Sequence, residues 1–391
     1  MSNRSTLAAA CLLALCAQWA WAAPFLPQRG SEVIERLPRR TDPAQQQLQQ
    51  LRARLAANPR DLALATSVAA SYIATARRET DPRYFGYAQA ALAPWWSMPA
   101  PPHAVRLLRA TLLQSTHHFP EALADLDAIV KADPANPQAW LTLATVQTVR
   151  GDYQGATASC ARLSSLTTQL VSSTCIAGVG GMTGRAAPSE NLLALSLRRN
   201  EDADAGIKVW VLTLLAELAE RRGDATAAEA RFKDALALAP RDSYLVGAYA
   251  DFLLDRRRAA DVVALVAGQD RIDGLLLRHA LALKQLPDGA ARLRAADAEL
   301  AARFNAATRR GDTVHQREQA RYELHVRGNA QAALKLARLN WAVQKESADM
   351  RILLEAAHAA GEREAGAPVR DWLHTHKVED VTLARLAGKG A

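Results

Sequence analysis

Residues 215–240 constrain the fold more than any other part of the chain. Ala216 and Ala228 are small, as they must be where two antiparallel helices approach closely, and Phe232 is large enough to fill the space beside them. Gly223 can end the first helix because glycine tolerates a positive φ, and a proline closes the segment. The pattern predicts two antiparallel helices joined by a short turn.

The spacing of these residues resembles that of a tetratricopeptide repeat. Similar units recur along the chain, most clearly at residues 103–136, from 137 onward, 209–240 and 313–343. The resemblance implies an all-α fold, a right-handed solenoid of antiparallel helix hairpins that presents a binding surface. The composition agrees, because much of the 49% hydrophobic fraction is alanine, the best helix former.

The N-terminus has the pattern of a secretory signal. Arg4 is its single positive charge, and residues 7–17 form an apolar core. The motif Ala20-Trp21-Ala22 predicts cleavage between Ala22 and Ala23. An uncleaved membrane anchor is the alternative, although the apolar core is shorter than the roughly 20 residues that a spanning helix needs. We expect a periplasmic or secreted protein with a signal peptide (1–22), an irregular lead (23–42), N-terminal repeats (43–200), and C-terminal repeats (201–391) that include a capping helix (378–386).

Two cysteines follow the signal, Cys160 and Cys175. An exported protein meets an oxidising compartment. Cys160 also stands where the repeat usually has a large residue, and closing a loop of about 15 residues is worth about 3 kcal/mol in the chain-entropy model. We predict a disulfide between them that joins the second helix of one repeat to the first helix of the next. The alternative is two buried free thiols.

The sequence offers little for catalysis or for metal binding. The glycines of residues 178–184 resemble a dinucleotide fingerprint, but they lie in a helical pattern without a preceding strand. His315 and His325 would lie about 15 Å apart on one helix, too far to share a metal ion, and no clustered Cys/His spacing is present. We expect no cofactor, no metal and no enzyme activity. The alternative is a degenerate site formed by His315, Glu318, Arg321 and Tyr322.

The family resemblance also suggests a binding surface. In this family the first helix of each repeat lines a concave groove, chiefly through its second, fifth, ninth and twelfth residues, which share one helical stripe. The corresponding positions here give a candidate partner-binding set: Trp210, Thr213, Glu217, Glu220, Tyr244, Asp251, His315, Glu318 and Tyr322. Carboxylates beside aromatic anchors suit a peptide that carries Lys or Arg. The alternative is a set of ordinary solvated helix faces.

The charge balance bears on the partner. The net charge is +8 and the pI is about 9.5, which favours peripheral contact with an anionic envelope surface. The basic residues are scattered and lack an aromatic stacking platform, so we expect no nucleic-acid partner. The sequence predicts a protein-interaction scaffold of the cell envelope that binds a peptide or a helix in its groove. A glycan- or polymer-binding solenoid and a self-associating solenoid are the alternatives, and the oligomeric state stays open.

Overall fold

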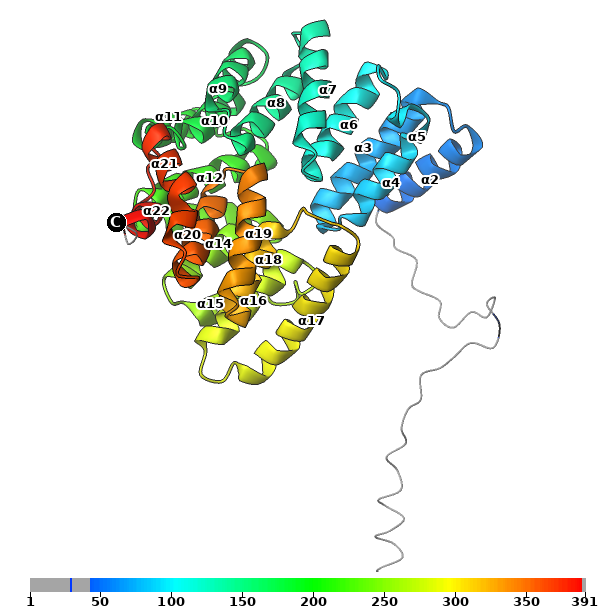
Figure 1. The fold of residues 1–391 in the computed structure, drawn as a ribbon. Coiled ribbons are helices and arrows are strands. Elements are labelled where there is room, and N and C mark those ends of the chain that lie inside the picture. The colour runs from blue at the N-terminus through cyan, green and yellow to red at the C-terminus, as the bar shows by residue number, and fades with distance from the viewer. Residues whose placement is uncertain (1–28, 30–42, 389–391) are drawn as a thin grey trace, which may run out of the picture. The chain divides into compact units, whose positions relative to one another are not determined.

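The computed structural model describes Arg29 and residues 43–388 (Figure 1). The chain divides into two compact units, Met1–Gln50 and Leu51–Ala391. Helix α2 (Pro43–Ala57) contains the boundary between them. The predicted signal peptide, its cleavage between Ala22 and Ala23, and the irregular lead fall outside the described residues, apart from Arg29. The boundary expected at residue 200 lies within the second unit.

Every regular element of the described residues is a helix, and these residues contain no strand. In the second unit, successive helices pair as hairpins: α3 (Leu62–Glu79) with α4 (Arg83–Ala91), α6 (His103–Ser115) with α7 (Phe119–Ala132), α8 (Pro137–Arg150) with α9 (Tyr153–Arg162), α10 (Gln169–Gly180) with α11 (Ala186–Arg198), α12 (Ala205–Arg221) with α13 (Ala225–Leu238), α14 (Ser243–Asp255) with α15 (Ala259–Leu265), α16 (Asp273–Gln285) with α17 (Ala290–Arg309), and α18 (Gln316–Tyr322) with α19 (Ala330–Val343). Helices α20 (Ser347–Ala359), α21 (Ala367–His376) and α22 (Val381–Gly388) end the chain, and the short α5 (Ala93–Trp96) follows the first hairpin. The predicted all-α solenoid of helix hairpins is confirmed. No helix in this described part is both long and apolar enough to span a membrane.

The α12–α13 hairpin shows why this sequence folds as it does. Ala216 and Ala228 are completely buried where the two helices meet, and Phe232 is buried beside them. Gly223 has φ +86° and ends α12, a conformation that glycine adopts without strain. Asp224 then caps α13, because its carboxylate accepts a hydrogen bond from the backbone N–H of Ala227 at 3.0 Å. The residue types at the repeat offsets therefore have the packing roles predicted for them.

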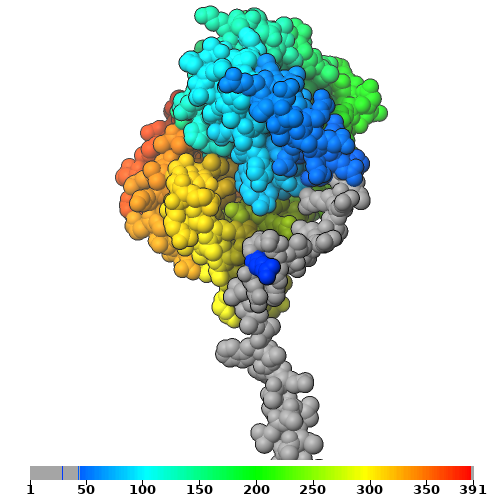
Figure 2. All heavy atoms as spheres, turned by 90° about the vertical axis from the view of Figure 1, so that its right-hand side faces the viewer, coloured from blue at the N-terminus to red at the C-terminus, as the bar shows by residue number. Residues whose placement is uncertain are grey.

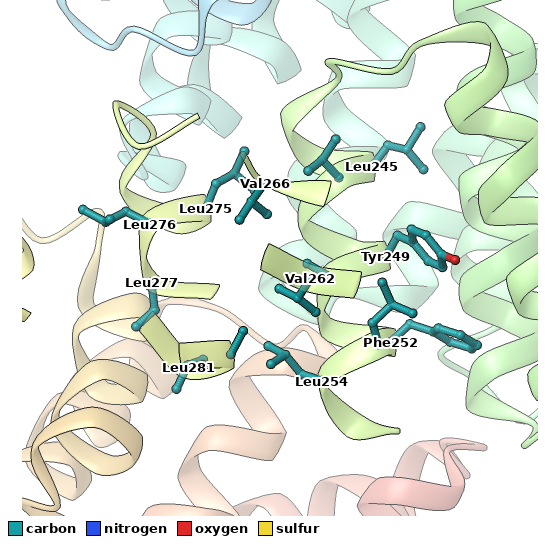
Figure 3. Close-up of a cluster of buried hydrophobic side chains, with 14 of the residues drawn as sticks. Leu245, Tyr249, Phe252, Leu254, Val262, Val266, Leu275, Leu276, Leu277 and Leu281 are labelled. Atoms are coloured by element: carbon teal, nitrogen blue, oxygen red, sulfur yellow. The ribbon is translucent and has the colours of Figure 1, made fainter. Parts of the chain in front are cut away.

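A continuous core runs through the hairpins from α12 to α18 (Figure 3). Tyr249 and Phe252 of α14 pack against Phe232 of α13, with ring centroids 5.4 and 5.6 Å from that ring. Figure 3 shows Val262 of α15 and Leu277 of α16 continuing the same layer of apolar side chains. Each hairpin thus buries an apolar face against its neighbour, as a solenoid requires.

A second core joins parts of the chain that are far apart in sequence. It combines side chains of α8, α9 and α10 with side chains of α18 to α22. The backbone N–H of Lys345 donates to the carbonyl of Val149 at 2.8 Å, and the Arg150 guanidinium donates to the carbonyl of Val343 at 3.0 Å. Figure 1 shows the C-terminal helices α20–α22 beside α10 and α12. We call this contact the closure, because it brings the last hairpins back onto the third.

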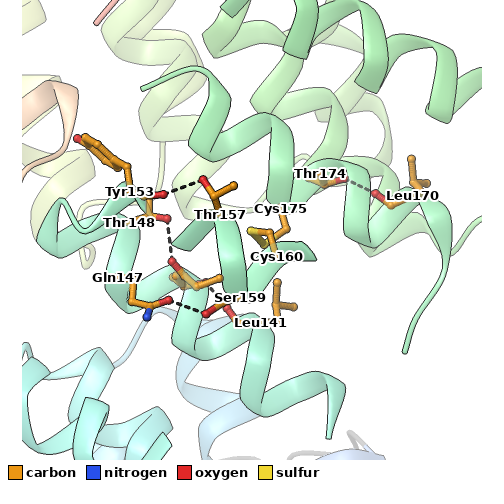
Figure 4. The surroundings of a disulfide bond; sticks show 12 residues. Leu141, Gln147, Thr148, Tyr153, Thr157, Ser159, Cys160, Leu170, Thr174 and Cys175 are labelled. Atoms are coloured by element: carbon orange, nitrogen blue, oxygen red, sulfur yellow. Dashed lines mark hydrogen bonds between the residues drawn. A yellow bond between two sulfur atoms is a disulfide. The ribbon is translucent and has the colours of Figure 1, made fainter. Parts of the chain in front are cut away.

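The predicted disulfide between Cys160 and Cys175 is present (Figure 4), with the two Cα atoms 5.5 Å apart. It joins α9 to α10, the second helix of one hairpin to the first helix of the next, as expected. Both cysteines are buried in the second core, close to the closure. The glycine-rich segment that follows has a packing role, because a Cβ at Gly181 would lie only 2.5 Å from the Leu218 side chain of α12.

Candidate functional site

A large cavity lies on the inner side of the second unit, with a volume of about 1370 Å³. The first helices of the later hairpins, α12, α14, α16, α18 and α20, form most of its wall. The ends of α3, α6 and α17 and the beginning of α22 complete it. In Figure 2 the cyan part of the chain, near residue 100, borders the yellow part, near residue 300. Thr80 at the end of α3 also donates to the Ser243 hydroxyl at 2.9 Å, so the N-terminal hairpins take part in enclosing the cavity.

Six of the nine predicted groove residues line this cavity: Glu217, Glu220, Tyr244, Asp251, His315 and Glu318. They come from α12, from α14 and from the start of α18, so the structure brings three separate repeats onto one surface. The Tyr244 side chain is well exposed there, at 66% of its full area. Trp210 is 38% exposed but does not belong to the wall.

Two of the predicted positions are corrected. Thr213 is only 4% exposed, and its hydroxyl donates to the carbonyl of Val209 one turn earlier in α12. Tyr322 is 2% exposed and packs on Phe304 of α17, with ring centroids 5.3 Å apart. Its neighbour Arg321 lines the cavity instead. A shift of one residue turns a helix by about 100°, which is enough to exchange a wall residue for a core residue.

The expected acidic character of the groove is also corrected, because most of its carboxylates are paired with arginines. Asp251 lies 2.5 Å from a guanidinium nitrogen of Arg278 and 2.7 Å from one of Arg321. Burial alone would raise the pKa of Asp251, but these two guanidinium groups lower it to about 2. The arginines of the wall are Arg77, Arg221, Arg271, Arg278, Arg303, Arg310, Arg317, Arg321 and Arg351.

The α20 side of the wall is paired in the same way. Arg351 makes ion pairs with Asp255 at 2.6 Å and with Glu355 at 2.8 Å. Glu355 also contacts the His325 ring nitrogen at 2.8 Å. Burial works to raise the pKa of Glu355, but its bonds to His325 and Arg351 lower it to about 2. Glu355 therefore stays ionised and neutralised over a wide pH range.

Two carboxylates of α12 are less well compensated. Glu217 accepts a hydrogen bond from the Tyr244 hydroxyl at 2.6 Å, and its nearest cation, Arg221, is 3.9 Å away. Burial raises the pKa of Glu217. The nearest cation to Glu220 is Arg256, at 3.5 Å, and burial together with the Asp255 carboxylate raises the pKa of Glu220 to about 7. Glu217, Glu220 and Tyr244, which we call the α12 patch, thus form the part of the wall best suited to gain from a cation.

The described residues contain no group of three or more His, Cys, Asp and Glu side chains that could hold a metal ion. His315 precedes α18, whereas His325 lies in the π-helical turn Glu323–Arg327 and contacts Glu355. The proposed degenerate catalytic set is divided, since His315, Glu318 and Arg321 line the cavity and the fourth member, Tyr322, is in the core.

The sequence did not point to the wall residues at the two ends of the chain. Arg77 of α3 faces the cavity, and the described residues give it no ion pair or side-chain hydrogen bond; burial lowers its pKa. Arg351 of α20 and Leu383 of α22 belong to the same wall. The repeat offsets predict only how a helix packs on its nearest neighbours. They therefore cannot predict which residues from distant parts of the chain the closure brings to the cavity wall.

Comparison with known proteins gives a likeness of fold. No protein-family model and no curated protein matches the sequence. Among solved structures, the Cut9–Hcn1 hetero-tetramer of the APC/C aligns at a TM-score of 0.41 with 10% identity over 89% of this chain, which spans about half (52%) of that chain. A tetratricopeptide repeat protein from Parabacteroides merdae aligns at 0.39 with 13% identity, over 80% of this chain and 98% of its own. Yeast Tom70 aligns at 0.37 with 10% identity, over 89% and 92% of the two chains.

At these identities and TM-scores the likeness concerns the arrangement of helices and carries nothing about function. The chain's own hairpins carry the resemblance, because small, large and glycine residues occupy the tetratricopeptide offsets and have the packing roles those offsets require. The described residues thus form an all-α solenoid of helix hairpins that resemble tetratricopeptide repeats.

Proposed function

We propose that this protein is an exported scaffold of the cell envelope that binds a peptide or helical segment bearing Lys or Arg in its cavity. The observation that carries the proposal is the α12 patch, in which an exposed tyrosine donates to Glu217 and Glu220 lies three residues further along α12, on the wall of a large cavity. Tyrosine anchors and desolvated charges dominate the energetics of many interfaces. A cation placed beside Glu217 and Glu220 would relieve the electrostatic cost of burying them.

The size of the cavity supports a polypeptide segment over a small metabolite. Small-molecule sites usually enclose about 300–1,000 Å³, and this cavity measures about 1370 Å³. A glycan or polymer ligand would instead need a groove lined by aromatic residues with few charges. The many paired arginines and carboxylates of the wall do not favour such a ligand. Export is supported by the signal pattern of residues 1–22 and by the Cys160–Cys175 disulfide, since disulfides persist in oxidising compartments.

The test is crosslinking in living cells followed by mass spectrometry, comparing the wild type with a Glu217→Lys/Glu220→Lys variant. Asp251 is left unchanged, because reversing it would break its ion pairs with Arg278 and Arg321. Asp234→Lys on α13 with Glu121→Lys on α7 is the matched control, since both carboxylates are exposed and outside the cavity wall.

We expect a discrete protein partner that is lost in the Glu217→Lys/Glu220→Lys variant and retained in the control. A reversed variant that folds and keeps every partner would contradict the proposed site. Partners lost equally in both variants would show that overall charge, and not the cavity, decides binding.

A further inference from the structure

The last helix of the chain, α22, lies at the wall of the cavity. Thr382 and Leu383 of this helix, with Asp380 just before it, line the cavity. Leu383 is 1% exposed and belongs to the same core as side chains of α10 and α20. Helix α22 packs directly on α20. One face of α22 is therefore seated on the inner surface of the solenoid.

The residues around α22 also contact α11 and the α12–α13 turn. The Glu379 carboxylate accepts a hydrogen bond at 2.7 Å from the backbone N–H of Ala186, the first residue of α11. A helix N-terminus carries unpaired N–H groups and partial positive charge, so this carboxylate is well placed. Val381 lies 3.5 Å from where a Cβ of Gly223 would be, at the α12–α13 turn. The segment thus bridges α20 to α11 and to the end of α12.

The attachment of α22 rests on few groups. Leu383 is its only fully buried side chain, and Leu386 and Ala387 are partly buried against the same core. Val381 is 51% exposed, and Ala384 and Arg385 are exposed. The helix is short, and the four residues 377–380 connect it to α21. Terminal elements with little buried apolar surface open at a low free-energy cost. Release of α22 would leave α12 and α20 intact, because their own cores do not depend on Leu383 alone.

We propose that α22 is an internal ligand of a helix-binding site between α20, α11 and the end of α12. A partner fits this site when it presents a short amphipathic helix with a carboxylate four residues before a leucine, as Glu379 stands before Leu383. Such a partner displaces α22 and enters the cavity at this end. The inference rests on the proposed function only in taking the cavity as the partner surface.

The test uses the full chain and a synthetic peptide of residues 378–388. Leu383→Asp removes the buried anchor, and Ala384→Asp on the exposed side of the same helix adds the same charge as a control. Hydrogen exchange measured by mass spectrometry reports α22, α12 and α20 separately. Fluorescence anisotropy of the labelled peptide reports whether the site accepts this helix in trans. Glu379→Ala is a second, milder variant that removes only the acceptor of the Ala186 N–H.

We expect Leu383→Asp to expose α22 to exchange while α12 and α20 stay protected, and to bind the peptide at least tenfold more tightly than the wild type or Ala384→Asp. Glu379→Ala should give a smaller change in the same direction. Peptide binding that is equal in all four proteins would overturn the inference, and so would loss of protection in α12 and α20 together with α22. Neither measurement needs the cellular partner, so this inference and the proposed function fail separately.

Discussion

Replacing Gly151 by alanine tests the closure. Gly151 ends α8 with φ +82°, and a Cβ there would lie 2.7 Å from a ring carbon of Trp372 and 3.1 Å from the Lys345 side chain. Gly328 offers a matched control. It ends the π-helical turn Glu323–Arg327 with φ +72°, and a Cβ added there would have no atom within 4 Å. Both glycines sit at the turn of a hairpin, and only Gly151 faces the returning C-terminal helices.

The expected magnitudes follow from these contacts. An alanine in the left-handed region costs about 1–2 kcal/mol, and this cost applies to both sites. Forcing extra atoms into a packed contact adds about 1–3 kcal/mol, and this applies only to Gly151. Gly328→Ala should therefore lower the free energy of unfolding by about 1–2 kcal/mol and Gly151→Ala by about 2–5 kcal/mol. In a Trp372→Ala background the cost of Gly151→Ala should fall toward that of Gly328→Ala, with the contact to Lys345 as the remaining difference.

Two measurements check this prediction. Urea unfolding followed by circular dichroism gives the loss of stability of each variant and of the double variant. Hydrogen exchange at the Lys345 amide, which donates to the Val149 carbonyl across the closure, reports local opening. Exchange at Lys345 should accelerate more in Gly151→Ala than in Gly328→Ala. Equal destabilisation by the two substitutions, or an unchanged cost of Gly151→Ala when Trp372 is absent, would refute the packing of Trp372 on this turn.

Three further predictions concern the core and the cavity. Removing the disulfide by Cys160→Ala/Cys175→Ala should cost about 2–4 kcal/mol in thermal unfolding, and two alkylatable thiols in the non-reduced protein would contradict the bond. Glu190 is 7% exposed and pairs with Arg222 and with Arg231 at 2.6 Å, so Glu190→Ala should cost about 3–5 kcal/mol in urea unfolding, whereas the exposed Glu121→Ala should cost almost nothing. Burial and Asp255 raise the pKa of Glu220 from 4.5 to about 7, so the folded state binds the Glu220 proton more tightly than the unfolded state does. The contribution of Glu220 to stability therefore falls as pH rises from 4.5 to about 7, and Glu220→Gln should be about 1–3 kcal/mol more stable than the wild type above pH 7 and no more stable below pH 4.5. A gain of equal size at both ends of a pH series of urea unfolding would contradict the shift.

The hairpins were predictable from sequence because their determinants are local. The small residues, the turn glycine and the capping aspartate of the α12–α13 hairpin all lie within one repeat, and each acts on its nearest neighbours. The disulfide was predictable for the same reason, since Cys160 and Cys175 are only 15 residues apart and lie on adjacent helices. Six of the nine predicted groove residues line the cavity, because the repeat register assigned to their helices was correct at those positions.

The closure was not predictable in this way. Val149 and Lys345 are far apart in the chain, and their contact depends on small rotations that accumulate over several hairpins. The pairing of Asp251 with Arg278 and Arg321 likewise joins three different helices, so an apparently acidic stripe proved to be a neutralised network. Tyr322 was misplaced because one residue of register decides whether a helical side chain faces a cavity or the core.

Photo-crosslinking from single positions, in cells that produce the protein, tests directly whether a partner binds in the cavity. A photoreactive phenylalanine analogue at position 244 probes the cavity, where Tyr244 is 66% exposed. The same analogue at position 238 is the comparison, because Leu238 is 46% exposed and lies outside the cavity wall. We expect a discrete adduct from position 244 and none from position 238. An adduct from position 238 with none from position 244 would contradict the cavity as the partner-binding surface.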